Sequence, residues 1–191
     1  MICWLIWNRR SAQSRYYSFR WRPQHIEVMH FIRQFFCLSL VILGVGAHAQ
    51  QELPSLLPDF TVYDMQDQAF TPADMPTEGR LVVIFYDPGC GYCQKEAVAI
   101  GENYERFKHA SLYFVAMQDK PLIEEFIQKY GTLLQEKPNV RFLRDANYEF
   151  IDKFNPREYP STYVFSAANR RLVRYLSGDT PIGVLISVAS P

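Results

Sequence analysis

The sequence has no excess of charge, no long apolar run and few side chains that bind metal ions. Its 191 residues contain 20 Lys or Arg and 20 Asp or Glu residues, and this balance hides two unlike parts. Residues 1–49 hold six arginines against one glutamate, whereas residues 50–191 hold 14 basic and 19 acidic residues. An acidic remainder gives no electrostatic reason to bind nucleic acid, so we expect no nucleic-acid partner. The length favours a single domain with room for a sizeable core.

The basic N-terminal part has the pattern of a signal peptide at residues 29–49. A weakly charged segment, 29–34, precedes an apolar stretch from Phe35 to Gly46, whose 12 residues are too few to span a bilayer comfortably. The small residues of Ala47-His48-Ala49 then form an A-x-A cleavage site. We predict cleavage after Ala49 and a periplasmic or other extracytoplasmic location. An uncleaved anchor and a buried helix are the alternatives.

Three further segments complete the predicted organisation. Residues 1–28 show no sustained hydrophobic period and precede a plausible start at Met29. We interpret them as an upstream extension that is not part of the translated protein. Residues 50–58 are punctuated by prolines and predict a linker or an extended arm. Residues 59–191 form the predicted domain.

Cysteine and histidine are scarce in the predicted mature chain. Cys90 and Cys93 are the two cysteines, of four, that lie beyond the cleavage site, and His109 is the one histidine of four that does. A structural zinc site takes four such ligands, and a catalytic site usually takes three. We therefore expect no metal site and no dissociable cofactor. In an oxidising compartment, two cysteines can form one disulfide at most.

Hydrophobic patterning predicts strands that alternate with helices. Residues 81–86 are a continuous apolar run, as in a central strand that is covered on both faces. A helix is predicted from Cys90 to about Lys108. A second helix follows Pro121, with an apolar face of Leu122, Ile123, Phe126, Ile127, Tyr130, Leu133 and Leu134. The other expected elements are strands at 60–63, 111–117, 140–143, 161–167 and 170–178, and short helices at 147–154 and 180–190. This order describes a mixed α/β sandwich, with the two cysteines at a strand-to-helix junction.

The position of the two cysteines favours redox chemistry over a structural disulfide. A disulfide between residues three apart closes a very short loop and stabilises little, so an inert staple is the weaker interpretation. A cysteine in the first turn of a helix faces unpaired N–H groups and the positive end of the helix dipole, and both favour the thiolate. Cys90 is therefore the candidate nucleophile, and Cys93 is the thiol that would resolve a mixed disulfide.

Several motifs together resemble the thioredoxin-like superfamily, and most closely its TlpA/ResA branch of exported thiol–disulfide oxidoreductases. The resemblance covers about residues 57–178. It is carried by LPDFTVYD, which is similar to the opening strand, by GRLVVIFYDPGCGYCQKE, similar to the strand–CxxC–helix core, and by YPSTYVFSAANRRLVRYLSG, similar to the cis-proline strand and hairpin. Cys90 and Pro160 lie 70 positions apart, which fits the branch's extra helix–strand unit.

The resemblance implies a thioredoxin-like, three-layer α/β sandwich with a mixed central sheet. It implies that the protein reduces disulfides in cysteine-containing protein substrates and receives electrons from a membrane donor. Pro160 matches the cis-proline beside the disulfide, and Tyr159 would offer backbone contacts to a substrate; an ordinary trans proline is the alternative. The oligomeric state stays open.

Two more residues receive roles from the resemblance. Glu96 matches the acidic position of a C-x-x-C-x-x-E pattern, where it could accept or relay a proton from the resolving thiol. A solvated first-turn glutamate is the alternative. Tyr92 is expected to be exposed and to contact the substrate, or else to be a simple surface residue.

The sequence also departs from the family pattern. Tyr86-Asp87-Pro88-Gly89 replaces the usual Trp-Ala-x-Trp segment, and Ile84 stands where thioredoxin has a buried acid. Asp87 is a candidate substitute for that acid, although an exposed loop aspartate is the favoured interpretation. The Gly91-Tyr92 dipeptide is the one seen in the DsbC/DsbG isomerases, so an isomerase or oxidase is an alternative to a reductase.

Two rival functions stay open at this stage. A thiol peroxidase of the same fold usually carries a Pro-x-x-x-Thr/Ser-x-x-Cys pattern. Counted back from Cys90, Asp87 takes the threonine or serine position and the proline position falls in the apolar run, so neither fits. The other rival is a non-enzymatic binding module whose disulfide is inert.

Overall fold

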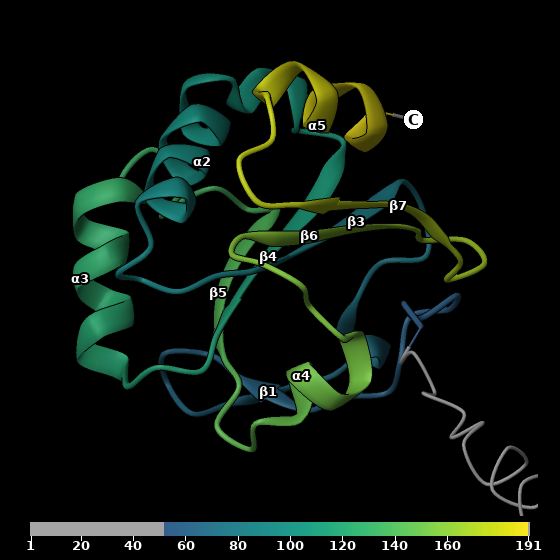
Figure 1. Ribbon diagram of the computed structural model, residues 1–191, viewed down its shortest axis with the longest axis horizontal. Helices are drawn as coiled ribbons and strands as arrows, with labels where there is room; N and C mark the ends of the chain where they lie inside the picture. Colours follow the sequence, from purple (N-terminus) through teal and green to yellow (C-terminus); the bar gives the residue numbers. More distant parts are fainter. Residues whose placement is uncertain (1–51, 191) are drawn as a thin grey trace, which may run out of the picture. The chain divides into compact units, whose positions relative to one another are not determined.

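The computed structural model of the protein describes residues 52–190. The predicted signal peptide at 29–49 and the predicted extension at 1–28 lie outside the described residues. The described part is organised around one mixed sheet of seven strands in the order β2-β1-β5-β4-β3-β6-β7 (Figure 1). The strands are β1 (Val62–Tyr63), β2 (Ala69–Phe70), β3 (Arg80–Phe85), β4 (Ala110–Ala116), β5 (Val140–Arg144), β6 (Ser161–Ser166) and β7 (Leu172–Ser177).

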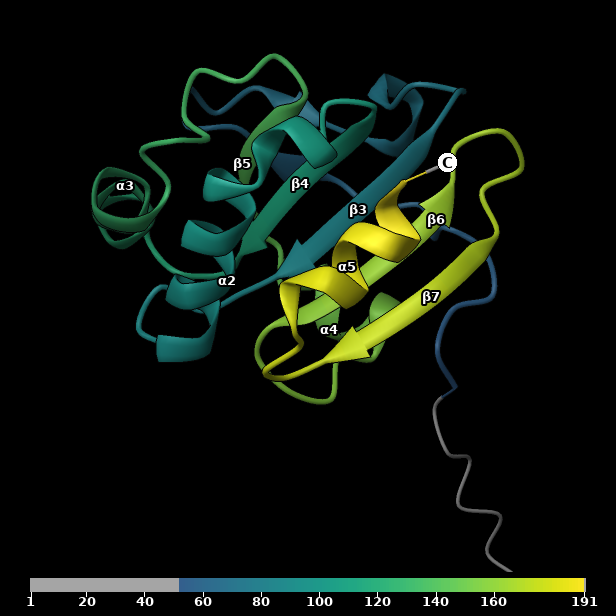
Figure 2. The ribbon, with the colours of Figure 1, turned by 90° about the horizontal axis from the view of Figure 1, so that it is seen from above.

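Helices cover both faces of this sheet. The α-helices are α2 (Gly91–Glu102), α3 (Lys120–Tyr130), α4 (Glu149–Phe154) and α5 (Ile182–Ala189), with short 3-10 turns η1 (Pro72–Asp74) and η2 (Tyr104–Arg106). Helices α2, α3 and α5 lie on one face and α4 lies on the other (Figures 1 and 2). The predicted three-layer α/β sandwich with a mixed central sheet is therefore confirmed.

Strand β3 divides the core into two halves. Val82 and Ile84 pack in the cluster that includes α2, α3 and α5, whereas Leu81, Val83 and Phe85 pack in the cluster that includes α4. All five side chains are at most 1% exposed. Successive side chains of a strand point to opposite faces, so a strand between two helical layers needs an unbroken apolar run. The prediction of a central strand covered on both faces is confirmed.

Helix α4 is fixed to the end of β5 by a buried acid. Asp145 is 0% exposed. Its Oδ1 accepts a hydrogen bond from the backbone N–H of Glu149 at 3.1 Å, and its Oδ2 accepts one from the N–H of Phe150 at 2.8 Å. These two N–H groups at the start of the helix have no partner within the helix, so the carboxylate satisfies them.

Two details of the helices differ from the prediction. Helix α2 ends at Glu102 rather than near Lys108, because Asn103 has non-helical dihedral angles and its side-chain Nδ2 donates to the carbonyl of Ala99 at 2.8 Å. A side chain that hydrogen-bonds its own backbone in this way competes with continued helix. The predicted apolar face of the second helix is also too wide. Leu122 and Leu133 are 50% and 53% exposed, and Leu133 lies beyond the end of α3.

The described part of the predicted linker, residues 52–58, is an extended arm against the β6–β7 hairpin. Leu57 N–H donates to the carbonyl of Arg170 at 2.8 Å, and Leu172 N–H donates to the carbonyl of Ser55 at 3.0 Å. The short strand β2, which the sequence did not predict, pairs antiparallel with β1. Both additions cover edges of the sheet that would otherwise present unpaired backbone groups.

A stack of aromatic rings supports the α4 side of the core. The Phe150 ring lies between Phe85 and Phe154, at centroid distances of 4.5 and 3.9 Å. We predict that Phe150→Ala lowers the free energy of unfolding by about 3–5 kcal/mol, because it removes a buried ring and leaves a cavity. Urea titration followed by circular dichroism measures the change.

The neighbouring variant Ile151→Ala is the control, because Ile151 lies in the same helix and is 45% exposed. Its expected effect is within about 0.5 kcal/mol. Equal losses for the two variants would mean that α4 is held by something other than this stack.

Candidate functional site

The two cysteines lie where four strand ends meet. Strands β3, β4 and β5 run parallel, so their carboxyl ends reach the same edge of the sheet. Strand β6 runs antiparallel and begins at that edge, with Ser161 paired to Phe85. The loop after β3, the turn after β4 and the loop before β6 are therefore neighbours in space. The carboxyl edge of a parallel sheet is a common place for a functional site.

Cys90 occupies the N-cap position of α2 and is partly exposed. Its backbone N–H donates to the carbonyl of Asp87 at 3.0 Å, which closes the turn that leads into the helix. Its Sγ lies 3.7 Å from the carbonyl oxygen of Tyr159, to which the thiol donates a hydrogen bond. The thiol that is accessible to another protein is thus the one at the start of the helix.

Cys93 lies one turn further along α2 and is 2% exposed. Both cysteines are free thiols. Burial raises the pKa of Cys93 far above its usual range, the backbone of Asp87 lowers it by a hydrogen bond, and Cys90 and Glu96 raise it further. A thiolate is costly in such an apolar environment, so Cys93 is held as a thiol in the reduced protein.

The segment before β6 brings Tyr159 and Pro160 against the dithiol. The Tyr159–Pro160 peptide bond is cis, as the family resemblance implied. Pro160 is buried, and its carbonyl accepts a hydrogen bond from the N–H of Gly178 at 2.9 Å. The Tyr159 ring packs on Phe85 with a centroid distance of 5.2 Å. The ring contact with Phe85 of β3 and the hydrogen bond from Gly178, which follows β7, therefore fix the position of the Tyr159 carbonyl that faces Cys90.

Glu96 turns its carboxyl group toward the interior. Thr162 Oγ1 donates to Glu96 Oε1 at 3.3 Å, and Oε2 is buried with no hydrogen-bond partner among the described residues. Desolvation by burial raises the pKa of Glu96 to about 7; the Thr162 hydrogen bond lowers it and the charge of Asp179 raises it. The alternative of a solvated first-turn glutamate is wrong. A carboxyl with this pKa exchanges protons at neutral pH.

A small pocket lies beside Glu96. Its volume is about 210 Å³, and its lining includes Tyr92, Lys95, Pro160 and Asp179. Tyr92 is 50% exposed, and the Lys95 ammonium lies 5.3 Å from the centroid of its ring. The expectation that Tyr92 is exposed is therefore confirmed. The pocket gives the interior carboxyl a route to the surface next to the dithiol.

Asp87 is not the exposed loop aspartate that the sequence favoured. It is half-buried, its Oδ1 accepts from the N–H of Gly89 at 2.7 Å, and its Oδ2 accepts from Gln118 Nε2 at 2.6 Å. Asp87 lies in the CxxC loop, whereas Ile84, which stands at the position of thioredoxin's buried acid, is buried within β3. Through its hydrogen bonds to Gly89 and Gln118, the Asp87 carboxylate holds the shape of the loop.

Sequence reasoning missed two residues at this site. Thr162 pairs with Ile84 in the β3–β6 register and so faces α2, where it meets Glu96. Gln118 follows β4 and reaches Asp87 across 31 positions of sequence. The alternation of β6 could have placed Thr162 on the α2 face. No local signal identifies Gln118, because its role depends on which strands are neighbours.

Neither a metal site nor a membrane span is found in residues 52–190. No three His, Cys, Asp or Glu side chains in this range lie close enough together to bind a metal ion. None of its helices is both long and apolar enough to cross a bilayer.

Comparisons with known proteins agree with the fold. No curated protein matches the chain. Among solved structures, MTB dsbF is 19% identical, with a TM-score of 0.59, and the match covers 72% of this chain and 97% of that one. A secreted Mycobacterium tuberculosis disulfide oxidoreductase, described as homologous to Escherichia coli DsbE, is 18% identical, with a TM-score of 0.56 and coverage of 68% and 93%. StoA from Bacillus subtilis is 14% identical, with a TM-score of 0.54 and coverage of 70% and 98%.

At these identities the solved structures establish the fold, which is that of thioredoxin-like thiol–disulfide oxidoreductases, and the resemblance stated from the sequence is confirmed. The profile of the AhpC/TSA family matches residues 55–175, which is most of the described chain. The protein is therefore a thioredoxin-like member of the AhpC/TSA family.

Proposed function

We propose that the protein is an exported thiol–disulfide oxidoreductase that reduces disulfides in other proteins through Cys90 and Cys93. The observation that carries this proposal is the asymmetry of the pair. Cys90 is partly exposed at the start of α2, whereas Cys93 is buried behind it with a raised pKa. One thiol is placed to attack a partner and the other to release it. A purely structural disulfide would not need one exposed and one buried cysteine.

In the first step, the Cys90 thiolate attacks one sulfur of the substrate disulfide. The bond from Cys90 Sγ to that sulfur forms, the substrate S–S bond breaks, and the second substrate sulfur leaves as a thiolate. The carbonyl oxygen of Tyr159 lies 3.7 Å from Cys90 Sγ. Substrate backbone that flanks the attacked sulfur therefore comes within reach of the Tyr159 backbone. The half-exposed ring of Tyr92 offers a second contact at the helix start.

In the second step, Cys93 attacks Cys90 Sγ and releases the reduced substrate. The Cys93 thiol must lose its proton, and burial makes this loss unfavourable until an acceptor is close. Glu96 lies on the same helix, and with a pKa of about 7 its carboxylate can take that proton at neutral pH. The products are a Cys90–Cys93 disulfide and a substrate thiol, so two electrons have passed to the substrate.

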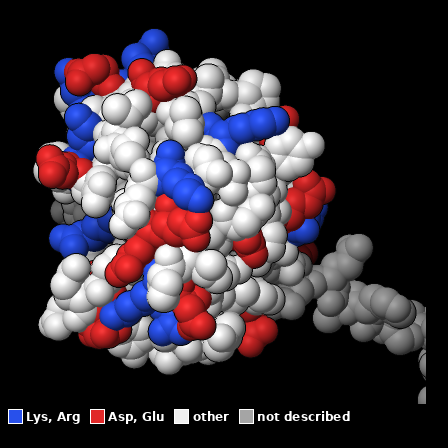
Figure 3. Space-filling model, turned by 90° about the vertical axis from the view of Figure 1, so that its left-hand side faces the viewer, with Lys and Arg blue, Asp and Glu red and all other residues white. Residues whose placement is uncertain are grey.

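Turnover in the reducing direction needs a donor that returns two electrons to the Cys90–Cys93 disulfide. We assign this role to a membrane partner, because the predicted signal peptide places the protein outside the cytoplasm. Relatives of the same fold support export: one is described as secreted, and another as a pneumococcal exposed lipoprotein thioredoxin. The face on the α3 side carries interspersed basic and acidic residues (Figure 3), which suits protein partners better than nucleic acid.

The local chemistry favours disulfide exchange over peroxide reduction at a single cysteine. Asp87 stands where the peroxidase pattern has a threonine or serine hydroxyl, and its two carboxylate oxygens are engaged by Gly89 and Gln118. The site therefore offers Cys90 no hydroxyl donor at this position. A second thiol lies one helical turn away.

The first test is to trap the mixed disulfide. We predict that Cys93→Ser accumulates a covalent adduct between Cys90 and substrate proteins, because the attack still occurs and the resolving thiol is missing. Non-reducing electrophoresis of periplasmic extracts, followed by mass spectrometry, detects the adducts. Cys90→Ser is the matched control and should form none. Absence of adducts with Cys93→Ser would contradict the exchange mechanism.

The second test addresses the direction of electron flow. We expect the reduction potential of the Cys90–Cys93 pair to lie near that of thioredoxin, about −270 mV, because the proposed role is reductive. Equilibration with dithiothreitol or glutathione buffers and thiol alkylation gives the value. A potential near that of DsbA, about −120 mV, would instead make the protein an oxidant or isomerase.

The third test concerns the proton on Glu96. Its pKa is raised from 4.5 to about 7 on folding, so the folded state binds the proton more tightly than the unfolded state. This contribution to stability is present at low pH and is lost as pH rises through about 7. We predict that Glu96→Gln loses less stability than the wild type between pH 5 and pH 8 in urea titrations.

The control for this test is Glu124→Gln, because Glu124 is an exposed glutamate of α3. It should keep the pH dependence of the wild type. If Glu96→Gln kept it as well, Glu96 would not titrate near neutral pH and could not serve as the proton acceptor.

A further inference from the structure

Gln118 is a partly buried link between the turn after β4 and the CxxC loop. Its Nε2 donates to Asp87 Oδ2 at 2.6 Å, across 31 positions of sequence. The sheet register explains the contact: Phe85 pairs with Val115, so residues shortly after each strand emerge side by side. Both residues also line a pocket of about 520 Å³ between the CxxC loop and α3.

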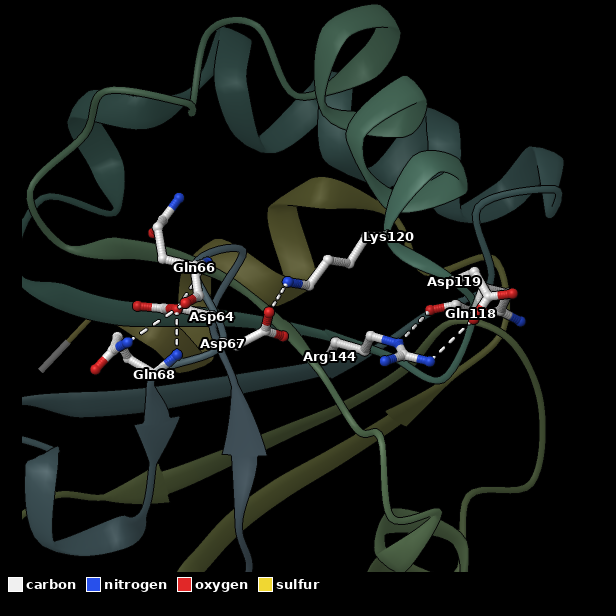
Figure 4. Close-up of polar contacts among 8 residues, drawn as sticks. All are labelled: Asp64, Gln66, Asp67, Gln68, Gln118, Asp119, Lys120 and Arg144. Atoms are coloured by element: carbon white, nitrogen blue, oxygen red, sulfur yellow. Dashed lines mark hydrogen bonds and ion pairs between the residues drawn. The ribbon is translucent and has the colours of Figure 1, made fainter.

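The backbone of Gln118 is itself fixed from β5. Arg144 Nε donates to the carbonyl of Gln118 at 3.1 Å, and Arg144 Nη2 donates to Asp119 Oδ1 at 2.9 Å. Figure 4 shows the guanidinium group facing both residues, at the start of α3. A planar guanidinium that holds two groups of one turn leaves that turn little freedom. Gln118 therefore presents its amide to Asp87 from a rigid support.

Asp87 in turn holds both cysteines through its main chain. Its carbonyl accepts the N–H of Cys90 at 3.0 Å, and its backbone forms a hydrogen bond to the Cys93 thiol. Its side chain is fixed at both oxygens, by Gly89 N–H and by Gln118. The orientation of this peptide segment thus bears directly on the Cys93 sulfur, whereas the Cys90 sulfur is held by the carbonyl of Tyr159.

The arrangement has a cost. Gln118 Oε1 is buried and has no hydrogen-bond partner among residues 52–190. A buried amide oxygen without a partner lowers stability, and an apolar side chain of similar size would avoid the loss. Sequences that break such a rule do so mostly at functional sites. What the amide provides in return is its N–H donor to Asp87.

We propose that Gln118 is a positioning residue for the resolving step, which acts by holding Asp87 so that its backbone hydrogen bond reaches Cys93. The inference rests on the proposed function, because it concerns the attack of Cys93 on a mixed disulfide at Cys90. In that step the Cys93 Sγ–Cys90 Sγ bond forms and the bond from Cys90 to the partner sulfur breaks. The partner leaves as a thiolate, and the proton of Cys93 goes to Glu96.

The experiment separates attack from resolution. Reduced protein is mixed with oxidised glutathione, the reaction is stopped with acid at successive times, and mass spectrometry quantifies the glutathione adduct and the internal disulfide. Fitting both species gives one rate for the attack of Cys90 and another for resolution by Cys93. Both rates are measured for the wild type, Gln118→Leu, Gln118→Glu and the control Gln128→Leu, a change of an exposed glutamine on α3.

For Gln118→Leu we expect resolution to be about tenfold slower, the scale of one weakened hydrogen bond, and attack to stay within about twofold of the wild type. The adduct should therefore accumulate. Gln128→Leu should match the wild type in both rates. Unchanged resolution in Gln118→Leu would overturn the proposal.

Gln118→Glu gives a signature that a general loss of packing does not produce. A protonated Glu at this position donates to Asp87 as the amide does, whereas an ionised one repels it. The other charged groups that line the pocket, Glu125 and Lys129, pair with each other. The ratio of variant to wild-type resolution rates should thus be higher at pH 5 than at pH 8, a test that also holds if Gln118→Leu does not fold.

A ratio that is independent of pH would contradict the proposal even if the leucine variant were slow. Failure of the proposed function looks different. In that case the wild type itself would form no glutathione adduct and no internal disulfide, and the positioning role would fall with it.

Discussion

The site depends on the burial of β3 on both faces and its pairing on both edges. Because β4 and β6 flank this strand in fixed register, the loop after Phe85 leaves the sheet next to the turn after β4 and next to Pro160. A one-residue slip of β3 would exchange its two faces and send apolar side chains to the wrong layer. The unbroken apolar run therefore does more than fill the core. It fixes where Cys90 emerges and which loops surround it.

The two thiols differ because the sheet edge gives them different surroundings. Cys90 meets solvent and a single carbonyl, that of Tyr159, whereas Cys93 is enclosed between α2 and the core. Desolvation makes a charge on Cys93 costly, and it also holds a proton on Glu96 up to about pH 7. In the proposed resolving step, transfer of the proton from the Cys93 thiol to the Glu96 carboxylate moves one negative charge between neighbouring groups and adds no further charge to the interior.

Much of this organisation could be predicted from the sequence, and the exceptions have physical causes. The run at 81–86 and the two cysteines after it were enough to place β3, α2 and the dithiol, because these features are local. Glu96 was identified from its match to the family's C-x-x-C-x-x-E pattern, but its contact with Thr162 from β6 could not be read from that pattern. Asp87 was misjudged for the same reason, since Gln118, which covers it, follows a different strand. The apolar face of α3 was overestimated at Leu133 because helical spacing does not reveal where the helix ends, and at Leu122 because spacing does not reveal how much of the helix the core covers.

Six buried side-chain atoms have no hydrogen-bond partner among residues 52–190, and three of them are oxygens of residues on the CxxC loop, on α2 and after β4: Tyr86 OH, Glu96 Oε2 and Gln118 Oε1. Each lowers stability, since a polar atom has lost water and gained no hydrogen bond. Glu96 and Gln118 also line pockets, whereas Cys93 is 2% exposed, so the apolar surroundings act most strongly on Cys93. A thiolate on Cys93 is destabilised there, so in the proposed mechanism it forms only during resolution, when Cys90 is already bonded to a partner. An early, stable thiolate would compete with Cys90 as nucleophile. In the proposed mechanism the burial of Cys93 therefore maintains the order of the two steps.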